Sequence, residues 1–155
     1  MGLSYLLCYN TLDNNLVWDI VPIFLKKESV QTMTILCVDD HPVIVKGLKD
    51  SVQRIYPEAN ILSFTAAKEA LAYAQSHGCD VLLCEIELYN HGGITLAEEI
   101  RMINPLVNII FVTVCSEQEH AEKVLKLCPS GYLTKPTTET LLAAQLQQLR
   151  YPVVC

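Results

Sequence analysis

Five polar residues stand where short apolar runs of the sequence end, and their types suit chemistry on phosphate. Asp39 and Asp40 follow the first run, Glu85 follows a later one, and Thr113 and Lys135 stand at the ends of the last two. Carboxylates brought together repel one another unless a cation joins them, and oxygen ligands suit Mg²⁺. A hydroxyl and an ammonium group beside such a site form a cradle for a phosphoryl group. Each residue alone is common at a strand end, so the prediction depends on their joint order.

The elements that position these residues alternate along the chain from Thr34 onward. The apolar runs that predict strands are 34–38, 61–64, 81–84, 108–112 and 131–133. The segments that predict helices are 43–55, 66–75, 96–103, 117–127 and 138–149. Runs that are apolar throughout are typical of a parallel sheet covered on both faces. The pattern predicts an α/β fold, a doubly wound (βα)5 five-stranded parallel sheet, whose functional groups collect beyond the carboxyl ends of the strands.

Length and charge narrow the classes of function. The chain has 155 residues and a formal net charge of −6, enough for one well-buried domain without the clustered basic surface that nucleic acid requires. Its seven cysteines are scattered and form no C-x-x-C pair, which disfavours a zinc site or a disulfide framework. A reduced, cytoplasmic setting is therefore expected.

The first 32 residues do not share the alternating pattern. Their apolar stretch, 16–25, contains Asp19 and Pro22 and is shorter than the roughly 20 residues of a membrane span. We predict an N-terminal extension over 1–32, a single domain over 33–150 and a tail over 151–155. The preferred interpretation of the extension is an added segment or a start assigned too far upstream. A membrane anchor or partner-binding strip is the alternative.

Four motifs of the chain resemble the receiver domains of two-component response regulators, in particular those of the NarL/FixJ class. The motifs are Asp39-Asp40-His41-Pro42, the stretch from Glu85 to Gly93, Phe111-Val112-Thr113, and the stretch from Gly131 to Pro136. The resemblance extends from 33 to about 150 and implies the flavodoxin-like receiver fold. It also implies a site in which Asp39 and Asp40 hold Mg²⁺ with the backbone carbonyl of Glu87. Thr113 would then contact a phosphoryl group and Lys135 would pair with its oxygens.

One departure from the family bears directly on this site. Glu85 stands at the phosphoacceptor position, where the family has Asp, and its extra methylene moves the carboxylate about 1.5 Å further into the pocket. Such a displacement would spoil in-line attack and weaken the Mg²⁺ site. It would also let Glu85 contact Lys135 or Thr113 directly, so that the domain is either inert or held in an active-like state. Tyr89 and Val114 are further departures, the first replacing a proline and the second restricting access to the pocket.

The resemblance also implies a switch residue and partners. Tyr132 matches an aromatic residue whose rotation reports the switch in many members, although a half-buried strand tyrosine is an equally open interpretation. The implied partners are a histidine kinase or another signalling protein, with a homodimer through the fourth and fifth helices. No nucleic acid and no membrane span are expected for this chain.

The leading interpretation is an atypical receiver in phosphorelay signal transduction. It would be a regulatory binding module, not an enzyme, that is phosphorylation-independent or weakly phosphorylated and has no output domain after it. The alternatives are a functional phosphoacceptor receiver that takes phosphate from a histidine kinase, and a truncated DNA-binding transcriptional regulator. A flavodoxin-like enzyme or nucleotide binder is disfavoured, since no Gly-rich loop follows the first strand.

Overall fold

The computed structural model describes residues 32–114 and 117–153, together with four short strands near the N-terminus. The chain divides into two compact units, Met1–Gln31 and Thr32–Cys155. The first unit contains two antiparallel strand pairs: β1 (Leu6–Cys8) with β4 (Asp19–Val21), and β2 (Thr11–Leu12) with β3 (Asn15–Leu16). The role of this unit and the predicted limits of the extension, domain and tail stay predictions.

The second unit is built on a five-stranded sheet. Its strands are β5 (Thr34–Val38), β6 (Asn60–Phe64), β7 (Val81–Cys84), β8 (Asn108–Thr113) and β9 (Gly131–Thr134). They lie in the order β6-β5-β7-β8-β9, and every neighbouring pair is parallel. The predicted doubly wound parallel sheet is therefore confirmed.

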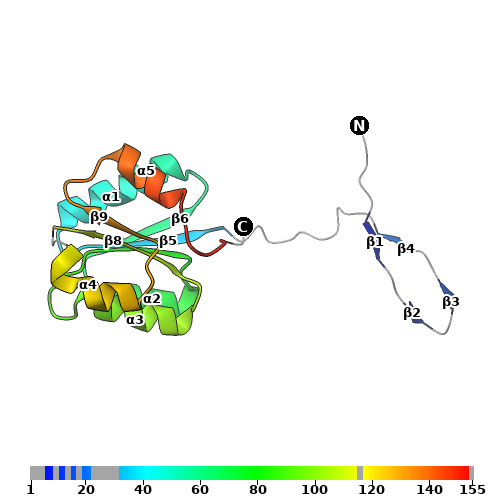
Figure 1. Ribbon diagram of the computed structural model, residues 1–155. Helices are drawn as coiled ribbons and strands as arrows, with labels where there is room; N and C mark the ends of the chain where they lie inside the picture. The colour runs from blue at the N-terminus through cyan, green and yellow to red at the C-terminus, as the bar shows by residue number, and fades with distance from the viewer. Residues whose placement is uncertain are drawn as a thin grey trace. The chain divides into compact units, whose positions relative to one another are not determined.

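Helices cover both faces of this sheet (Figure 1). They are α1 (Pro42–Ile55), α2 (Ala67–His77), α3 (Gly93–Ile103), α4 (Glu117–Lys126) and α5 (Glu139–Leu146). In Figure 1, α1 and α5 lie on one face and α2, α3 and α4 on the other. None of the described helices has both the length and the apolarity that crossing a membrane requires.

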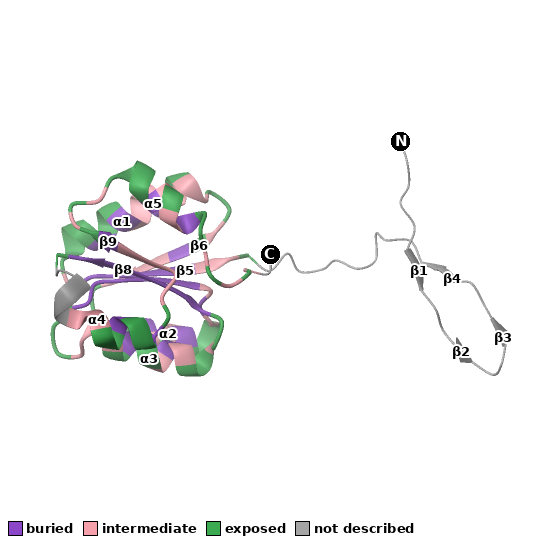
Figure 2. Ribbon diagram, in the orientation of Figure 1, coloured by how far each residue is buried: buried purple, intermediate pink, exposed green. Residues whose placement is uncertain are grey.

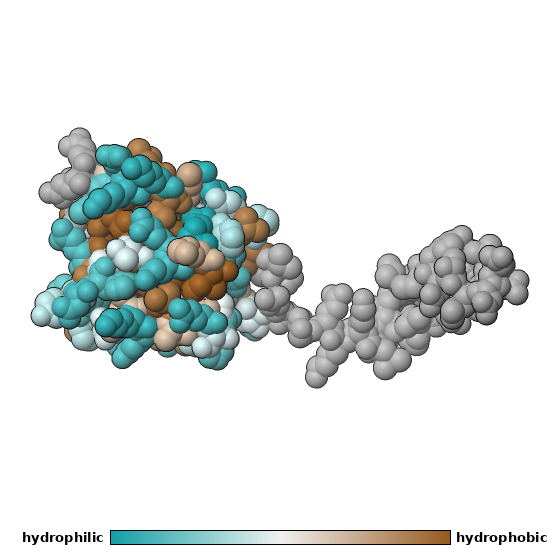
Figure 3. All heavy atoms as spheres, turned by 90° about the horizontal axis from the view of Figure 1, so that it is seen from below, coloured by the Kyte–Doolittle hydropathy of each residue, from teal (hydrophilic) through white to brown (hydrophobic). Residues whose placement is uncertain are grey.

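The core forms because the strands are apolar on both faces and each helix is apolar on one. The buried residues of α1 are Val45, Leu48 and Val52, spaced at three and four residues as one helical face requires. β7 and β8 are buried along their whole length, and Figure 2 shows β8 in purple. Figure 3 shows apolar and polar side chains interspersed on the face of this unit seen from below.

The last helix is shorter than predicted. α5 ends at Leu146, whereas the sequence pattern predicts a helix to residue 149. The amide of Gln148 bonds to the carbonyl of Gln145 in a tight turn, 3.1 Å. The amide of Tyr151 then donates to Asn108 Oδ1, 2.9 Å, and the Asn108 side chain donates back to the Tyr151 carbonyl, 3.0 Å. The chain leaves the helix because these bonds draw it toward the start of β8.

Candidate functional site

The predicted site residues meet because neighbouring parallel strands end at the same edge of the sheet. The amide of Glu85 donates to the carbonyl of Val38 (3.0 Å), which places the residue after β7 beside the end of β5. The amide of Lys135 donates to the carbonyl of Thr113 (2.8 Å), which joins the ends of β9 and β8 in the same way. The backbone ladder therefore brings Asp39, Glu85, Thr113 and Lys135 to one place.

The Glu85 carboxylate is the most heavily engaged group at this edge. Its side chain is 5% exposed, and Oε1 accepts hydrogen bonds from the Thr113 hydroxyl and from the amides of Ile86 (2.7 Å) and Glu87 (3.3 Å). Oε2 lies 2.5 Å from Nζ of Lys135. Both oxygens are thus held by donors inside the protein.

Lys135 joins two buried carboxylates. Its Nζ also donates to Oδ2 of Asp39, whose side chain is 2% exposed, while the lysine side chain is 12% exposed. Burial acts to lower the pKa of Lys135, but the hydrogen bonds to Asp39 and Glu85 and the charges of both carboxylates outweigh it, and the pKa is raised above the ordinary lysine value. The ammonium group therefore stays charged and offsets part of the negative charge at this edge.

Asp39 and Asp40 both contact Nδ1 of the His41 ring. Oδ1 of Asp39 accepts from the His41 amide (2.9 Å) and lies 3.1 Å from the ring Nδ1. Oδ2 of Asp40 accepts from the amide of Tyr89, 3.2 Å. Oδ1 of Asp40 lies 2.9 Å from His41 Nδ1, but it is buried and has no well-aligned hydrogen bond among the residues that the structure describes.

This arrangement fits a hard divalent cation. Ligand atoms of Asp39, Asp40 and His41 lie within 4.8 Å of one another. A buried carboxylate oxygen without a well-aligned hydrogen bond is costly, and a cation beside Asp40 Oδ1 would offset that cost. Asp39 and Asp40 would hold the ion, and it would supply positive charge where phosphate oxygens gather. The backbone amide of Glu87 donates to Glu85. A role for the backbone carbonyl of Glu87 as a ligand of this ion stays a prediction.

Gly93 closes the loop that follows Glu85. The amide of Gly93 donates to the Ile86 carbonyl (2.6 Å), and a Cβ at this position would overlap the backbone carbonyl of Glu85. The Cys84 thiol donates to the same carbonyl, 3.1 Å. Burial, with the charges of Glu85 and Asp39 adding to it, raises the pKa of Cys84 well above that of an ordinary thiol. Cys84 is therefore a packing residue that helps hold the backbone of Glu85.

The other residues predicted for the site are Tyr132, Glu87, Tyr89 and Val114. Tyr132 is half-buried and packs against the core cluster beneath α2, α3 and α4. The Glu87 side chain is largely exposed, with its carboxylate 3.7 Å from Nε2 of His120 on α4. Tyr89 and Val114 both expose their side chains, at 79% and 68%. A switching role for Tyr132 and restricted access at Val114 stay predictions.

Two residues of the site were not singled out from the sequence. His41 was assigned only to a motif, and Gly93 only to the closing of a loop. A signal for His41 exists, because a histidine directly after Asp39-Asp40 has both carboxylates within reach. A signal for Gly93 is its position at the start of a helix eight residues after Glu85, where the helix must approach a strand end closely.

Comparison with known proteins gives a consistent result. The sequence profile of the response regulator receiver domain matches residues 35–147. The chain is 26% identical over 116 residues to the response regulator GacA of Pseudomonas viridiflava. The aligned residues make up 75% of this chain and 53% of that protein. This chain is 36% identical over 72 residues to the transcriptional regulatory protein CitT of Bacillus subtilis (strain 168), 46% of this chain and 32% of that protein. The chain thus spans about half the length of GacA, or less in the case of CitT.

Solved structures share the fold. The chemotaxis protein CheY4 of Vibrio cholerae aligns with a TM-score of 0.69 at 22% identity, over 76% of this chain and 98% of that one. A LuxR-family two-component response regulator from Aurantimonas sp. SI85-9A1 aligns with a TM-score of 0.66 at 26% identity, over 75% of this chain and 83% of that one.

Proposed function

Since this chain belongs to the response regulator receiver domain family, we propose that it is a two-component signalling module whose acceptor position is occupied by Glu85 and held in an active-like arrangement without phosphorylation. Its unit over residues 33–150 would act on a partner protein and would not depend on a phosphorylation cycle. NarL/FixJ-class membership is part of the proposal and is supported by the Asp39-Asp40-His41-Pro42 motif.

The observation that supports this proposal is the set of partners of Glu85. In the family, the residues at the positions of Thr113 and Lys135 contact the phosphoryl group. Here the Glu85 carboxylate contacts the Thr113 hydroxyl and the Lys135 ammonium itself. A carboxylate in this place supplies negative charge and acceptor oxygens, the two properties by which a phosphoryl group acts on such neighbours. Glu85 would therefore stand in for the modified acceptor.

The same contacts disfavour attack on a phosphodonor. A nucleophilic oxygen must be free to approach phosphorus in line with the leaving group. Oε1 of Glu85 accepts three hydrogen bonds and Oε2 is paired with Lys135, 2.5 Å away. Attack would require breaking part of this network, so we infer that Glu85 accepts phosphate poorly.

Intact mass after incubation with Mg²⁺ and acetyl phosphate tests the acceptor position. We expect no change in the native chain and the gain of one phosphoryl group in Glu85→Asp, with Glu85→Asn as a control of aspartate length that lacks the nucleophile. Phosphorylation of the native chain would show a working receiver that takes phosphate from a donor. An unmodified Glu85→Asp variant would show that Glu85 is not the residue that removed phosphorylation.

A second measurement tests the active-like arrangement. Beryllofluoride was used to activate the DrrB receiver domain, one of the structural neighbours. Amide resonances of Thr113, Tyr132 and Lys135 in Glu85→Asp should move toward their native positions when beryllofluoride is added. Movement away from the native positions would show that the native chain is held in the inactive arrangement.

The partners are proposed by family membership alone. Receivers act with histidine kinases or other signalling proteins, and α4 and α5 are the surface through which we propose a homodimer. Cytoplasmic location and the absence of DNA binding are proposed on the charge and cysteine pattern of the sequence.

A further inference from the structure

The structure places a nitrogen atom beside the oxygen ligands that the family implies for its cation. Nδ1 of His41 lies 2.9 Å from Oδ1 of Asp40 and 3.1 Å from Oδ1 of Asp39. A neutral imidazole binds metal ions through either of its ring nitrogens, and it is the commonest side-chain ligand for them. His41 is therefore a candidate third ligand at this edge of the sheet.

The separations between these atoms suit a single ion. Two ligand atoms that bind one ion at about 2.0–2.1 Å and at right angles lie about 3.0 Å apart. Both distances from Nδ1 of His41 are close to this value, and ligand atoms of all three residues lie within 4.8 Å of one another. One ion would thus contact both carboxylates and the ring, with its remaining positions left to water.

The backbone after β5 holds the His41 ring in this place. The amide of His41 donates to Oδ1 of Asp39, 2.9 Å. His41 is also the N-cap of α1, with extended backbone (φ −95°, ψ 109°), but its side chain makes no capping hydrogen bond. The ring nitrogen is directed at the carboxylates instead. Because the side chain is 69% exposed, an ion can reach it from solvent.

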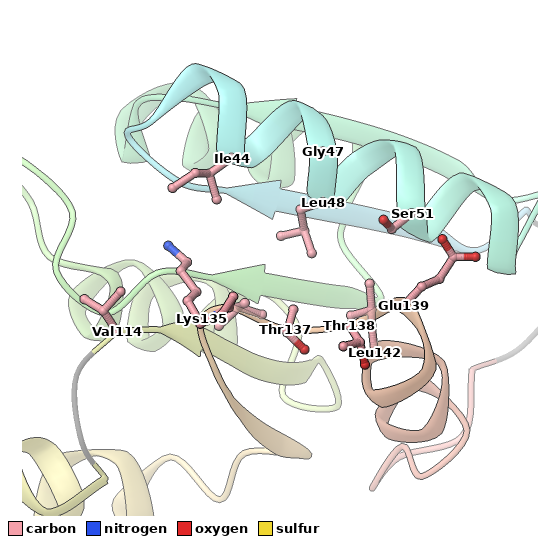
Figure 4. A pocket seen from close by; sticks show the side chains of 12 residues that line it. Ile44, Gly47, Leu48, Ser51, Val114, Lys135, Thr137, Thr138, Glu139 and Leu142 are labelled. Atoms are coloured by element: carbon pink, nitrogen blue, oxygen red, sulfur yellow. The ribbon is translucent and has the colours of Figure 1, made fainter.

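The charge at this edge matches a divalent ion. Asp39, Asp40 and Glu85 are carboxylates, and Lys135 is an ammonium group that contacts two of them. Figure 4 shows the Lys135 side chain reaching toward the end of β5. Two negative charges stay uncompensated among these four residues, and Oδ1 of Asp40 is buried with no well-aligned hydrogen bond from the described part of the chain. A doubly charged cation would balance this charge and give that oxygen a partner.

We propose that His41 is a metal ligand through Nδ1, and that it makes the site at Asp39, Asp40 and His41 select a divalent transition-metal ion over Mg²⁺. Imidazole suits ions such as Fe²⁺, Ni²⁺ and Zn²⁺, whereas Mg²⁺ is bound through carboxylates and keeps several waters. The ring therefore adds affinity for the first class and little for Mg²⁺. The inference rests on the cation site of the proposed receiver function and does not depend on Glu85 standing in for a phosphoryl group.

Titration of the full chain with Co²⁺, followed by its visible absorption, tests the site. We expect one bound ion per chain, which excess Mg²⁺ displaces, so that the displacement gives the Kd for Mg²⁺ at the same site. His41→Asn keeps a side-chain oxygen but removes the imidazole. It should raise the Kd for Co²⁺ on the order of tenfold or more, about 1.4 kcal/mol, shift the absorption band and change the Kd for Mg²⁺ much less.

Two further variants locate the effect. His77→Asn is the matched control, because His77 is an exposed histidine at the end of α2, at the opposite edge of the sheet, and both Kd values should stay as in the native chain. Asp40→Asn should weaken the binding of both ions, since each needs the carboxylate.

Three results would overturn the proposal. The first is no saturable binding of Co²⁺ by the native chain. The second is a ratio of the two Kd values that is the same in His41→Asn as in the native chain; if Asp40→Asn still weakens both ions, the cation site and the proposed function stand without a role for the ring. The third is Co²⁺ that Mg²⁺ does not displace and that shows the near-ultraviolet charge-transfer band of a thiolate ligand, which would assign the ion to a cysteine.

Discussion

The ammonium group of Lys135 lies 2.5 Å from the Glu85 carboxylate and donates at the same time to Asp39. Two buried carboxylates therefore share one cation at the carboxyl edge of the sheet. An ion pair of this kind stabilises a fold mainly by preventing unpaired buried charge, so the cost of removing one member depends on what is left behind. Removing Lys135 and removing Glu85 should therefore lower the free energy of unfolding by different amounts.

Lys135→Met should destabilise the protein by about 3–5 kcal/mol, because it leaves two buried carboxylates without their cation. Glu85→Gln should cost less, about 1–2 kcal/mol, because Lys135 keeps Asp39 as a partner. Urea unfolding followed by circular dichroism measures both. Lys46→Met is the matched control, because Lys46 pairs with Asp50 at 2.8 Å on the exposed face of α1, where solvent screens the pair, and its loss should change the unfolding free energy far less. Equal costs for Lys46→Met and Lys135→Met would contradict this account.

The contribution of Lys135 should vanish at high pH. Its folded-state pKa is raised above the ordinary value of 10.5, so the stabilisation is fully present below pH 10.5 and is lost as pH rises through the folded-state pKa. The difference in unfolding free energy between the native chain and Lys135→Met should therefore be constant from pH 7 to 10 and shrink above 10.5. Both proteins carry the other titratable groups, so comparing them at each pH cancels the contribution of those groups. A difference in unfolding free energy that grows above pH 10.5 would contradict the prediction.

Gly93→Ala should destabilise the protein, because the added Cβ would overlap the backbone carbonyl of Glu85 and approach the Cys84 sulfur to 3.0 Å. We expect a loss of about 1–3 kcal/mol, as for other overpacked sites. Gly47→Ala makes the same chemical change in open space and should stabilise α1 by roughly 0.5–1 kcal/mol. Thermal unfolding of the two variants should thus shift in opposite directions, and a neutral Gly93→Ala would mean that α3 can move away from the strand end.

Much of the fold could be predicted because apolar runs and their ends are local features of the sequence. β5 and β7 have the predicted bounds, and parallel pairing then requires Asp39 and Glu85 to meet. The end of α5 could not be predicted, since it depends on the bonds of Asn108 to Tyr151, residues 43 positions apart.

The contacts within the site were less predictable than its location. Whether Glu85 reaches Lys135, Thr113 or both depends on side-chain rotamers, which a strand pattern does not determine. The placement of the His41 ring against Asp39 and Asp40 likewise depends on the backbone just after β5. Residue type and strand order predicted which groups would meet, but not which atoms would bond.

The described cysteines should differ in reactivity toward N-ethylmaleimide. Cys37, Cys79 and Cys84 are buried, whereas Cys128 is exposed. Burial raises the pKa of Cys37 to about 12, and it also raises the pKa values of Cys79 and Cys84, so little thiolate exists at neutral pH. Peptide mass spectrometry over time should show rapid modification of Cys128 and modification of the other three only when the protein unfolds. Rapid native-state labelling of Cys84 would show that the strand end beside Glu85 opens.

Mg²⁺ should stabilise the chain through Asp40, whose buried Oδ1 lies 2.9 Å from the His41 ring nitrogen but accepts no well-aligned hydrogen bond from the described residues. Thermal unfolding with and without millimolar Mg²⁺ should show a rise in Tm that is lost in Asp40→Asn, because only the folded state presents both carboxylates to the ion. Glu58→Gln removes an exposed carboxylate just before β6, at the other edge of the sheet, and should leave the Mg²⁺ effect intact.

Glu85→Asp should respond to Mg²⁺ more strongly than the native chain. Both oxygens of Glu85 are held by Thr113, Lys135 and backbone amides, so they offer little to an ion. The shorter aspartate would reach these donors less well and leave an oxygen for the cation. If its Kd is tenfold lower, the stabilisation at saturating Mg²⁺ grows by about 1.4 kcal/mol. An equal or smaller Mg²⁺ response in Glu85→Asp would mean that the length of Glu85 does not weaken the site.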